Sequence, residues 1–103
     1  MDEMKSKRTK ALEIPKEVKE KVLERDEHCI VCGNPVDAFF ASAHYIPRSK
    51  GGLGIKENVV ALCFHCHRKY DQGIERKVIG EFIKNHLERH YPGFKDEDRI
   101  YRK

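Results

Sequence analysis

The pair Cys29-Ile-Val-Cys32 and the pair Cys63-Phe-His-Cys66 decide how this chain folds, and thirty residues separate them. All four cysteines of the sequence lie in these two Cys-x2-Cys turns. Each turn presents two thiolates with backbone N–H groups directed at the sulfur atoms, and four thiolates are a donor set that tetrahedral Zn2+ binds. In a cytosolic chain, cysteines paired in this way indicate a zinc site rather than disulfides. We therefore expect Cys29, Cys32, Cys63 and Cys66 to hold a structural Zn2+ that supplies folding free energy.

The composition predicts one small domain that does not enter a membrane. The chain has 103 residues, of which 37% are charged, so its core is limited and a bound metal would stabilise it. No apolar run approaches the ~20 residues that a membrane helix needs, and the first ten residues are too polar for a signal peptide. A cytoplasmic location is therefore expected. The net charge of +4 is compatible with DNA binding that weakens as the salt concentration rises.

Hydrophobic spacing divides the chain into helices and strands. Pro15 and the apolar residues after it predict a short amphipathic helix. Residues 38–46 and 59–62 are rich in β-branched and aromatic side chains, which predicts a hairpin around a glycine-rich loop. A further helix is expected from Phe64, and a longer one ends near His90. The apolar residues that predict the longer helix are Ile74, Val78, Phe82, Ile83 and Leu87.

The same pattern predicts how the chain is organised. Residues 14–93 form a single domain with its core at about 25–73. Residues 1–13 are polar and basic and predict a flexible tail, and residues 94–103 predict a C-terminal tail.

A histidine, an asparagine and a second histidine follow one another between and just after the cysteine pairs, at His44, Asn58 and His67. The motifs around them are Cys29-x2-Cys32-Gly33, His44-x2-Pro47-Arg48-x2-Gly51-Gly52 and Asn58-x4-Cys63-x2-Cys66-His67. In this order and at these spacings, the residues from Arg25 to Gly73 resemble the HNH endonuclease family.

The resemblance implies an α+β fold. Its centre is a small ββα-metal core, the His-Me finger, with a structural zinc site made by four cysteines and a flanking helix on the N-terminal and C-terminal sides. The small size of the chain and the segment 68–71 also resemble the stand-alone HNH proteins of tailed phages. That likeness implies the cytoplasm of a bacterial host cell, and contact with a phage terminase during DNA packaging.

The resemblance also implies metal-dependent hydrolysis of DNA phosphodiester bonds. His44 is the expected general base, because an imidazole with a pKa near ~6.5 accepts a proton from water at neutral pH. His67 is expected to bind a divalent ion, Mg2+ or Mn2+, that polarises the phosphate and stabilises the leaving oxygen. Asn58 is expected to hold the loop and orient the base through hydrogen bonds to the backbone.

Basic residues near the expected phosphate site predict contacts to the DNA backbone. Such contacts carry no sequence information, and no recognition helix is apparent, so little sequence specificity is expected. The residues expected to bind DNA are Arg48, Lys50, Arg68 and Lys69.

One position departs from the family pattern. Most HNH proteins place an Asp or a His, which is a principal metal ligand, immediately before the base histidine. This chain has Ala43 there, which has no ligand atom. Asp71 lies four residues after His67, and residues at i and i+4 share a helix face, so both could bind one ion. Alternatively, His44 itself contacts the metal, or the catalytic ion binds weakly or not at all.

Three functions are compatible with these residues. The first is a metal-dependent DNA endonuclease that nicks one strand or cuts both. The second, which Ala43 motivates, is a catalytically degenerate, zinc-stapled DNA-binding module. The third is an accessory protein that binds a terminase, and such a protein could also cut DNA within that assembly.

Overall fold

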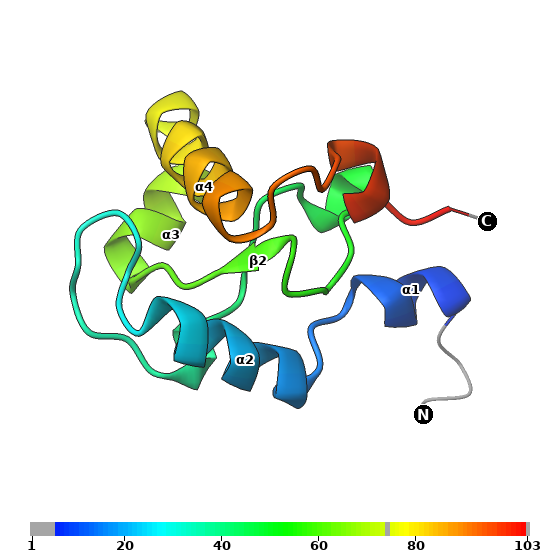
Figure 1. Cartoon of the computed structure of the whole chain (residues 1–103), viewed down its shortest axis with the longest axis horizontal. Coiled ribbons are helices and arrows are strands. Elements are labelled where there is room, and N and C mark those ends of the chain that lie inside the picture. The colour runs from blue at the N-terminus through cyan, green and yellow to red at the C-terminus, as the bar shows by residue number, and fades with distance from the viewer. Residues whose placement is uncertain (1–5, 74, 103) are drawn as a thin grey trace.

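The computed structural model describes residues 6–73 and 75–102 of the chain (Figure 1). Its helices and strands are α1 (Lys7–Leu12), α2 (Lys16–Asp26), β1 (Ala43–His44), β2 (Val59–Val60), α3 (Phe64–Asp71) and α4 (Arg76–His90). Short 3-10 helices lie at Ala38–Phe40, Arg48–Lys50 and Asp96–Arg99. Two antiparallel strands followed by α3 confirm the α+β fold expected from the sequence. Within the described ranges, no helix is both long enough and apolar enough to cross a membrane.

β2 lies at the centre of the molecule, between α2 on one side and the packed pair α3 and α4 on the other (Figure 1). The side chains of residues 59–62 alternate between two cores, because successive residues of a strand point to opposite faces. Val59 and Ala61 pack against α2, whereas Val60 and Leu62 pack against α3 and α4. All four side chains are fully buried, which explains why this strand is a continuous apolar run in the sequence.

The strands are shorter than the sequence predicts. Antiparallel pairing is limited to Ala43 opposite Val60 and His44 opposite Val59. Asp37 interrupts the extended conformation before β1, because its carboxylate accepts a hydrogen bond of 3.0 Å from the N–H two residues later and caps a 3-10 turn. Side-chain capping therefore replaces ladder pairing in the first half of the predicted strand.

α4 is the long helix that the sequence predicts, and it buries only part of the predicted apolar pattern: Ile83 and Leu87 are fully buried. Val78 and Phe82, two residues of the predicted apolar pattern, are 56% and 47% exposed. Ile74, the first residue of that pattern, lies outside the described residues. Adjacent apolar residues along this segment are compatible with two orientations of the helix, and packing on α3 selects one of them. The buried residues of α4 are Ile79, Ile83 and Leu87.

The N-terminal segment contains a helix where the sequence predicts a flexible tail. Ser6 caps α1, since its hydroxyl accepts a hydrogen bond of 3.0 Å from the Thr9 N–H. Leu12 ends the helix and is only 3% exposed. Burial of a leucine side chain stabilises a fold by about 2 kcal/mol, so this residue anchors α1 on the domain. Residues 1–5 of the predicted tail lie outside the described residues.

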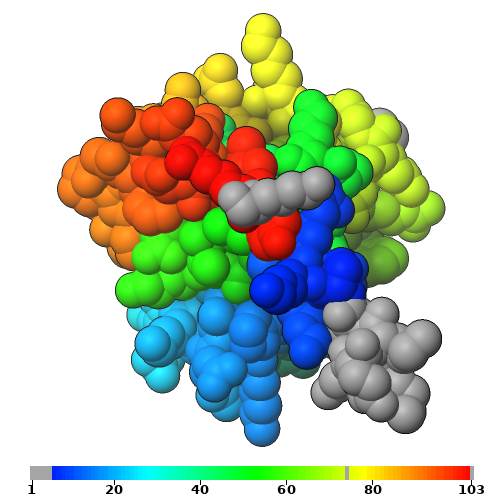
Figure 2. All heavy atoms as spheres, turned by 90° about the vertical axis from the view of Figure 1, so that its right-hand side faces the viewer, coloured from blue at the N-terminus to red at the C-terminus, as the bar shows by residue number. Residues whose placement is uncertain are grey.

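Both terminal segments hold the loop between the strands, residues 45–58, which we call the glycine loop. The Gly54 N–H donates to the Ala11 carbonyl at 3.0 Å. Only glycine permits this approach, because a Cβ at that position would lie 1.8 Å from a backbone oxygen of the N-terminal segment. On the C-terminal side, the Leu53 N–H donates to the Arg99 carbonyl at 2.8 Å. Figure 2 shows the N-terminal segment (blue) beside the C-terminal segment (red) on this side of the molecule.

Arg99 anchors the C-terminal segment and is itself 3% exposed. Its Nε donates to the Glu57 carbonyl at 2.6 Å, and its Nη1 lies 2.9 Å from the Asp96 carboxylate. Its guanidinium also lies 5.8 Å from the centre of the Tyr45 ring. The C-terminal segment therefore packs on the glycine loop through a buried cation whose partners belong to both.

A buried carboxylate joins the two cores. The Asp26 side chain is fully buried and accepts hydrogen bonds from Arg25 Nη2 at 2.8 Å, His86 Nε2 at 2.7 Å and the Ala61 N–H at 2.9 Å. Burial by itself raises the pKa of Asp26, but the hydrogen bonds from Arg25 and His86 outweigh it and lower this pKa to about 2. Asp26 thus remains ionised and connects α2 to the segment after β2 and to α4.

Replacement of Asp26 by alanine should lower the free energy of unfolding by about 3–5 kcal/mol, because it leaves the Arg25 guanidinium buried without its carboxylate. His86→Ala removes a single hydrogen bond to the same carboxylate and should cost about 1–2 kcal/mol. Urea unfolding at neutral pH with Zn2+ present measures both. Glu24→Ala, an exposed position on α2, is the control and should change the free energy by less than about 0.5 kcal/mol. An Asp26→Ala variant as stable as this control would contradict the structural role.

Candidate functional site

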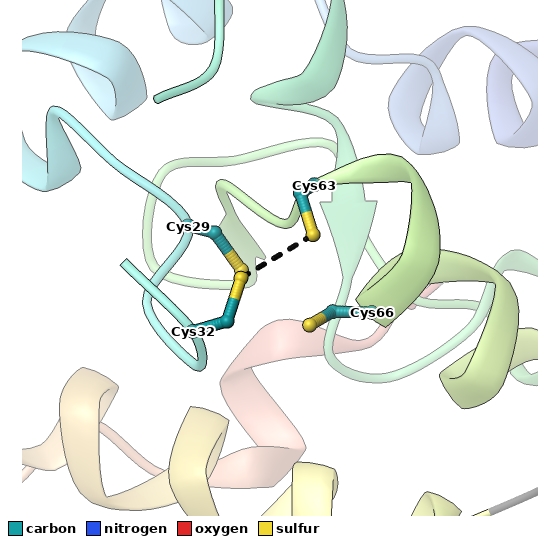
Figure 3. Close-up of side chains that lie close together, drawn as sticks. All are labelled: Cys29, Cys32, Cys63 and Cys66. Atoms are coloured by element: carbon teal, nitrogen blue, oxygen red, sulfur yellow. Dashed lines mark hydrogen bonds between the residues drawn. The ribbon is translucent and has the colours of Figure 1, made fainter. Parts of the chain in front are cut away.

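The four cysteine side chains converge on one point (Figure 3). Cys29 and Cys32 come from the loop after α2, whereas Cys63 caps α3 and Cys66 lies in its first turn. Their sulfur atoms all lie within 4.8 Å of one another, and Cys32 Sγ is 3.5 Å from Cys63 Sγ. A tetrahedral zinc site with Zn–S distances of ~2.3 Å separates its sulfurs by about 3.8 Å. The four thiols are free and fit a zinc ion.

The electrostatics of the thiols favour a bound cation. Burial raises the pKa of Cys29, but backbone N–H groups of Cys32, Cys63 and Val31 outweigh it and lower this pKa to about 7. Burial and the neighbouring thiols raise the pKa of Cys66 well above its ordinary value. Four thiolates are therefore stable together only when a cation neutralises them, and metal binding must release protons.

His44 ends β1 and is partly buried beside the N-terminal segment. Its Nε2 lies 2.9 Å from the Leu12 carbonyl oxygen. A carbonyl can only accept, so Nε2 carries the hydrogen and the neutral ring keeps its lone pair on Nδ1. Burial lowers the pKa of His44, and the nearby charges of Arg48 and His67 act in the same direction, against the opposing effect of the Leu12 carbonyl. The ring is thus neutral at pH 7 and has a free nitrogen that can accept a proton.

Asn58 is fully buried at the end of the glycine loop. Its Oδ1 accepts a hydrogen bond of 2.9 Å from the Ile46 N–H, and its Nδ2 donates to the carbonyls of Ile46 and Leu53 at 3.2 and 2.9 Å. Gly52 is required beside this amide, because a Cβ there would lie 1.6 Å from the Ile46 carbonyl oxygen. Asn58 therefore binds the backbone at two points of the loop, one of them two residues after His44.

His67 and Asp71 lie one turn apart on α3. His67 Nε2 is 3.3 Å from Asp71 Oδ2, and the Asp71 side chain is 64% exposed. Ligands of an octahedral ion with bond lengths of ~2.1 Å lie about 3 Å apart, so these two atoms are close enough to bind one ion. Both side chains line a cleft of about 240 Å³, together with His44 and Arg48. The two histidines of the sequence motif and the predicted ligand Asp71 are therefore brought to one cleft.

Ala43 faces away from this cleft. It is fully buried and packs with Val60 and Leu62 in the core that α3 and α4 cover. Successive residues of a strand point to opposite faces, so the Ala43 side chain points away from that of His44 and its neighbours are apolar side chains. Among the described residues, only the four cysteines bring three or more ligand atoms together. His67 and Asp71 thus have no third close ligand of these types beside them in the described part of the chain.

The basic residues expected to bind DNA lie in different surroundings. Arg48 lines the cleft. Lys50 is exposed at the end of the 3-10 turn that Arg48 begins. Arg68 lies over the Phe64 ring at 5.9 Å, and Lys69 pairs with Glu75 at 3.2 Å. The structure therefore brings one of the four predicted DNA-binding residues into the cleft.

Two features of the cleft have no signal in the sequence. Arg76, at the start of α4, lines it, with its Nη1 2.8 Å from the Tyr70 carbonyl oxygen and its guanidinium 4.3 Å from the centre of the Tyr70 ring. The Leu12 carbonyl that binds His44 is a backbone group, and any residue type supplies one. Both contacts depend on tertiary packing, and no motif spacing predicts them.

Removal of the metal should unfold the domain, because four neighbouring thiols then lose the cation that holds them. We expect a strong zinc chelator to abolish the cooperative thermal transition followed by circular dichroism, and added Zn2+, but not Mg2+, to restore it. Co2+ in place of Zn2+ should give the visible absorption of a tetrahedral thiolate site, and Cys63→Ser should lose it. Zinc affinity should fall as the pH is lowered, because protons compete with Zn2+ for the thiolates. Identical unfolding with and without the metal would contradict the zinc site.

Comparison with known proteins supports the same interpretation. Residues 29–73 match the family model of the HNH endonuclease. The matched range contains both cysteine pairs, both strands, the glycine loop and α3. Neither the comparison with curated proteins nor that with solved structures gives a match. Residues 29–73 are thus an HNH endonuclease domain, in agreement with the resemblance of the sequence motifs.

Proposed function

We propose that this chain is a divalent-metal-dependent endonuclease that hydrolyses DNA phosphodiester bonds with little sequence specificity, and that it carries a structural Zn2+ on its four cysteines. The observation that supports this most directly is the cleft in which His44 and the His67–Asp71 pair lie together within an HNH domain. The most specific part of the proposal is that the chain acts beside a terminase in phage DNA packaging, and this part rests on the resemblance alone.

In this proposal, His44 is the general base. Its Nδ1 accepts a proton from the attacking water, and the Leu12 carbonyl, which accepts the Nε2–H, stabilises the imidazolium that forms. This contact also sets the ring orientation, as a carboxylate does for the histidine of a catalytic triad. Asn58 acts as a positioning residue, since it holds the backbone that follows His44.

The phosphate binds beside the opposite wall of the cleft. When bound by His67 and Asp71, Mg2+ or Mn2+ supplies the Lewis acid that polarises the phosphate and stabilises the leaving oxygen. Arg48 and Arg76 line the same cleft and neutralise phosphate charge. Arg76 is already held by the Tyr70 carbonyl and ring, so little conformational entropy is lost when it binds phosphate.

The burial of Ala43 favours a second candidate function. Because this residue faces the core, a catalytic ion would have only His67 and Asp71 as close protein ligands among the residues that the structure describes, and those two residues alone would hold it weakly. A chain that never binds this ion productively would be a zinc-stapled DNA-binding module. It would bind DNA equally with and without Mg2+ and would cut none.

Nicking of supercoiled plasmid in the presence of Mg2+ or Mn2+ tests the proposed function. The zinc-loaded protein should convert supercoiled DNA to open-circular or linear forms. His44→Ala and His67→Ala should each lower the rate at least about 100-fold, because general-base and metal catalysis contribute factors of this size. His90→Ala, an exposed histidine on α4 outside the cleft, is the matched control and should retain activity. Absence of cleavage with every metal, while DNA still shifts in a gel, would establish the binding-module alternative instead.

The pH dependence of cleavage should report the lowered pKa of His44. The base is active when neutral, so the rate rises with pH through this pKa and then levels off. Because burial lowers the pKa of His44 from its ordinary 6.5, the midpoint of the rise should lie below pH 6.5. An NMR titration of His44 in the zinc-loaded protein without Mg2+ or Mn2+ measures the same pKa without the catalytic ion. A midpoint at or above pH 6.5 in that titration would contradict the buried, neutral base.

A further inference from the structure

The cleft is the middle of a longer depression. On the α4 side it shares Tyr70 and Arg76 with a hollow of about 520 Å³ that Lys77 and Lys84 also line. On the α2 side it shares His44 and Arg48 with a hollow of about 380 Å³ that Lys19 also lines. Because neighbouring hollows have wall residues in common, the three form one groove, and His44 lies near its middle. We call this the basic groove, from Lys19 to Lys84.

Most charged groups of the basic groove are cationic. The basic residues on its walls are Lys19, Arg48, Arg76, Lys77 and Lys84. The acidic ones are Glu13, Asp71 and Glu81, and Asp71 belongs to the proposed metal position. Such a surface attracts a polyanion, and its affinity falls as salt rises, because condensed counterions are released on binding.

The spacing of the lysines on α4 suits a phosphate backbone. Lys77 and Lys84 are two helical turns apart, which is about 10 Å along the helix axis. One DNA strand carries a phosphate per ~3.4 Å of duplex axis, so this separation corresponds to about three nucleotides. The side chains of both lysines are exposed. Gly80 lies between them on the same wall and leaves the groove open there.

We propose that the DNA strand lies along the whole basic groove, so that Lys77 and Lys84 of α4 bind phosphates on one side of the scissile bond and Lys19 of α2 binds one on the other. This assignment rests on the proposed function, because it takes His44 as the reacting centre. α4 and α2 lie outside residues 29–73, so this contact surface belongs to parts of the chain that the HNH family model does not match. Glu81 faces the same groove and opposes the phosphate charge there.

Binding of a short DNA duplex, followed by fluorescence anisotropy in buffer without Mg2+ or Mn2+, tests the groove separately from catalysis. The double variant Lys77→Ala/Lys84→Ala should bind about tenfold more weakly at ~0.1 M salt, and the slope of log K against log salt should decrease in magnitude by about 2. Glu81→Gln should bind more tightly. Lys21→Ala removes one positive charge from an exposed position of α2 outside the groove and should bind like the wild type.

The kinetic readout distinguishes the groove from the nuclease assignment. In plasmid nicking, the double variant should raise KM and leave kcat at saturating DNA close to that of the wild type, since neither lysine contacts the reacting atoms. If the double variant binds duplex as tightly as Lys21→Ala while the wild type cuts plasmid, the groove assignment is wrong and the nuclease assignment stands. If the wild type cuts nothing but the double variant loses affinity and salt dependence as expected, the groove is supported and the nuclease assignment fails.

Discussion

The convergence of four sulfur atoms is the constraint on which the rest of the structure depends. Thiols this close cannot all ionise unless a cation lies between them. Burial and the neighbouring thiols raise the pKa of Cys66, whereas backbone N–H groups outweigh burial and lower the pKa of Cys29 to about 7. A metal bound at this point would join the loop after α2 to the first turn of α3. It would thereby hold the start of α3 in place, and with it the helix that carries His67 and Asp71. In a chain of 103 residues with two small cores, no apolar contact could replace this link easily.

The orientation of His44 depends on parts of the chain that lie outside residues 29–73. The N-terminal segment supplies the carbonyl that binds His44 Nε2, and it accepts the Gly54 N–H. The C-terminal segment pairs with the glycine loop through Ile100, which lies opposite Gly52 in an isolated bridge. The loop has little secondary structure of its own, so these contacts determine its conformation. The part of the chain that holds His44 and the glycine loop in place is therefore larger than residues 29–73.

β1 determines which of its two residues reaches the cleft. Its two residues point in opposite directions, so His44 faces the cleft while Ala43 fills the core next to Cys29 and Leu62. A carboxylate at position 43 would face those apolar neighbours and would be costly to bury unless a metal ion bound it. The chain instead places an exposed carboxylate, Asp71, one turn after His67. Such a pair would bind a divalent ion less firmly than three converging ligands would.

The sequence by itself determined the elements whose geometry is local. Two residues between cysteines bring both thiols of a pair within reach of one metal ion, and four residues along a helix bring His67 and Asp71 to one face. The order of strand, glycine loop, strand and helix followed from the same local patterns. Only the tertiary structure decided that α1 would form and dock, that α4 would bury Ile79 rather than Val78, and that Arg76 would reach the cleft. These outcomes depend on which surfaces meet, and on backbone carbonyls that every residue type carries, so no spacing in the sequence encodes them.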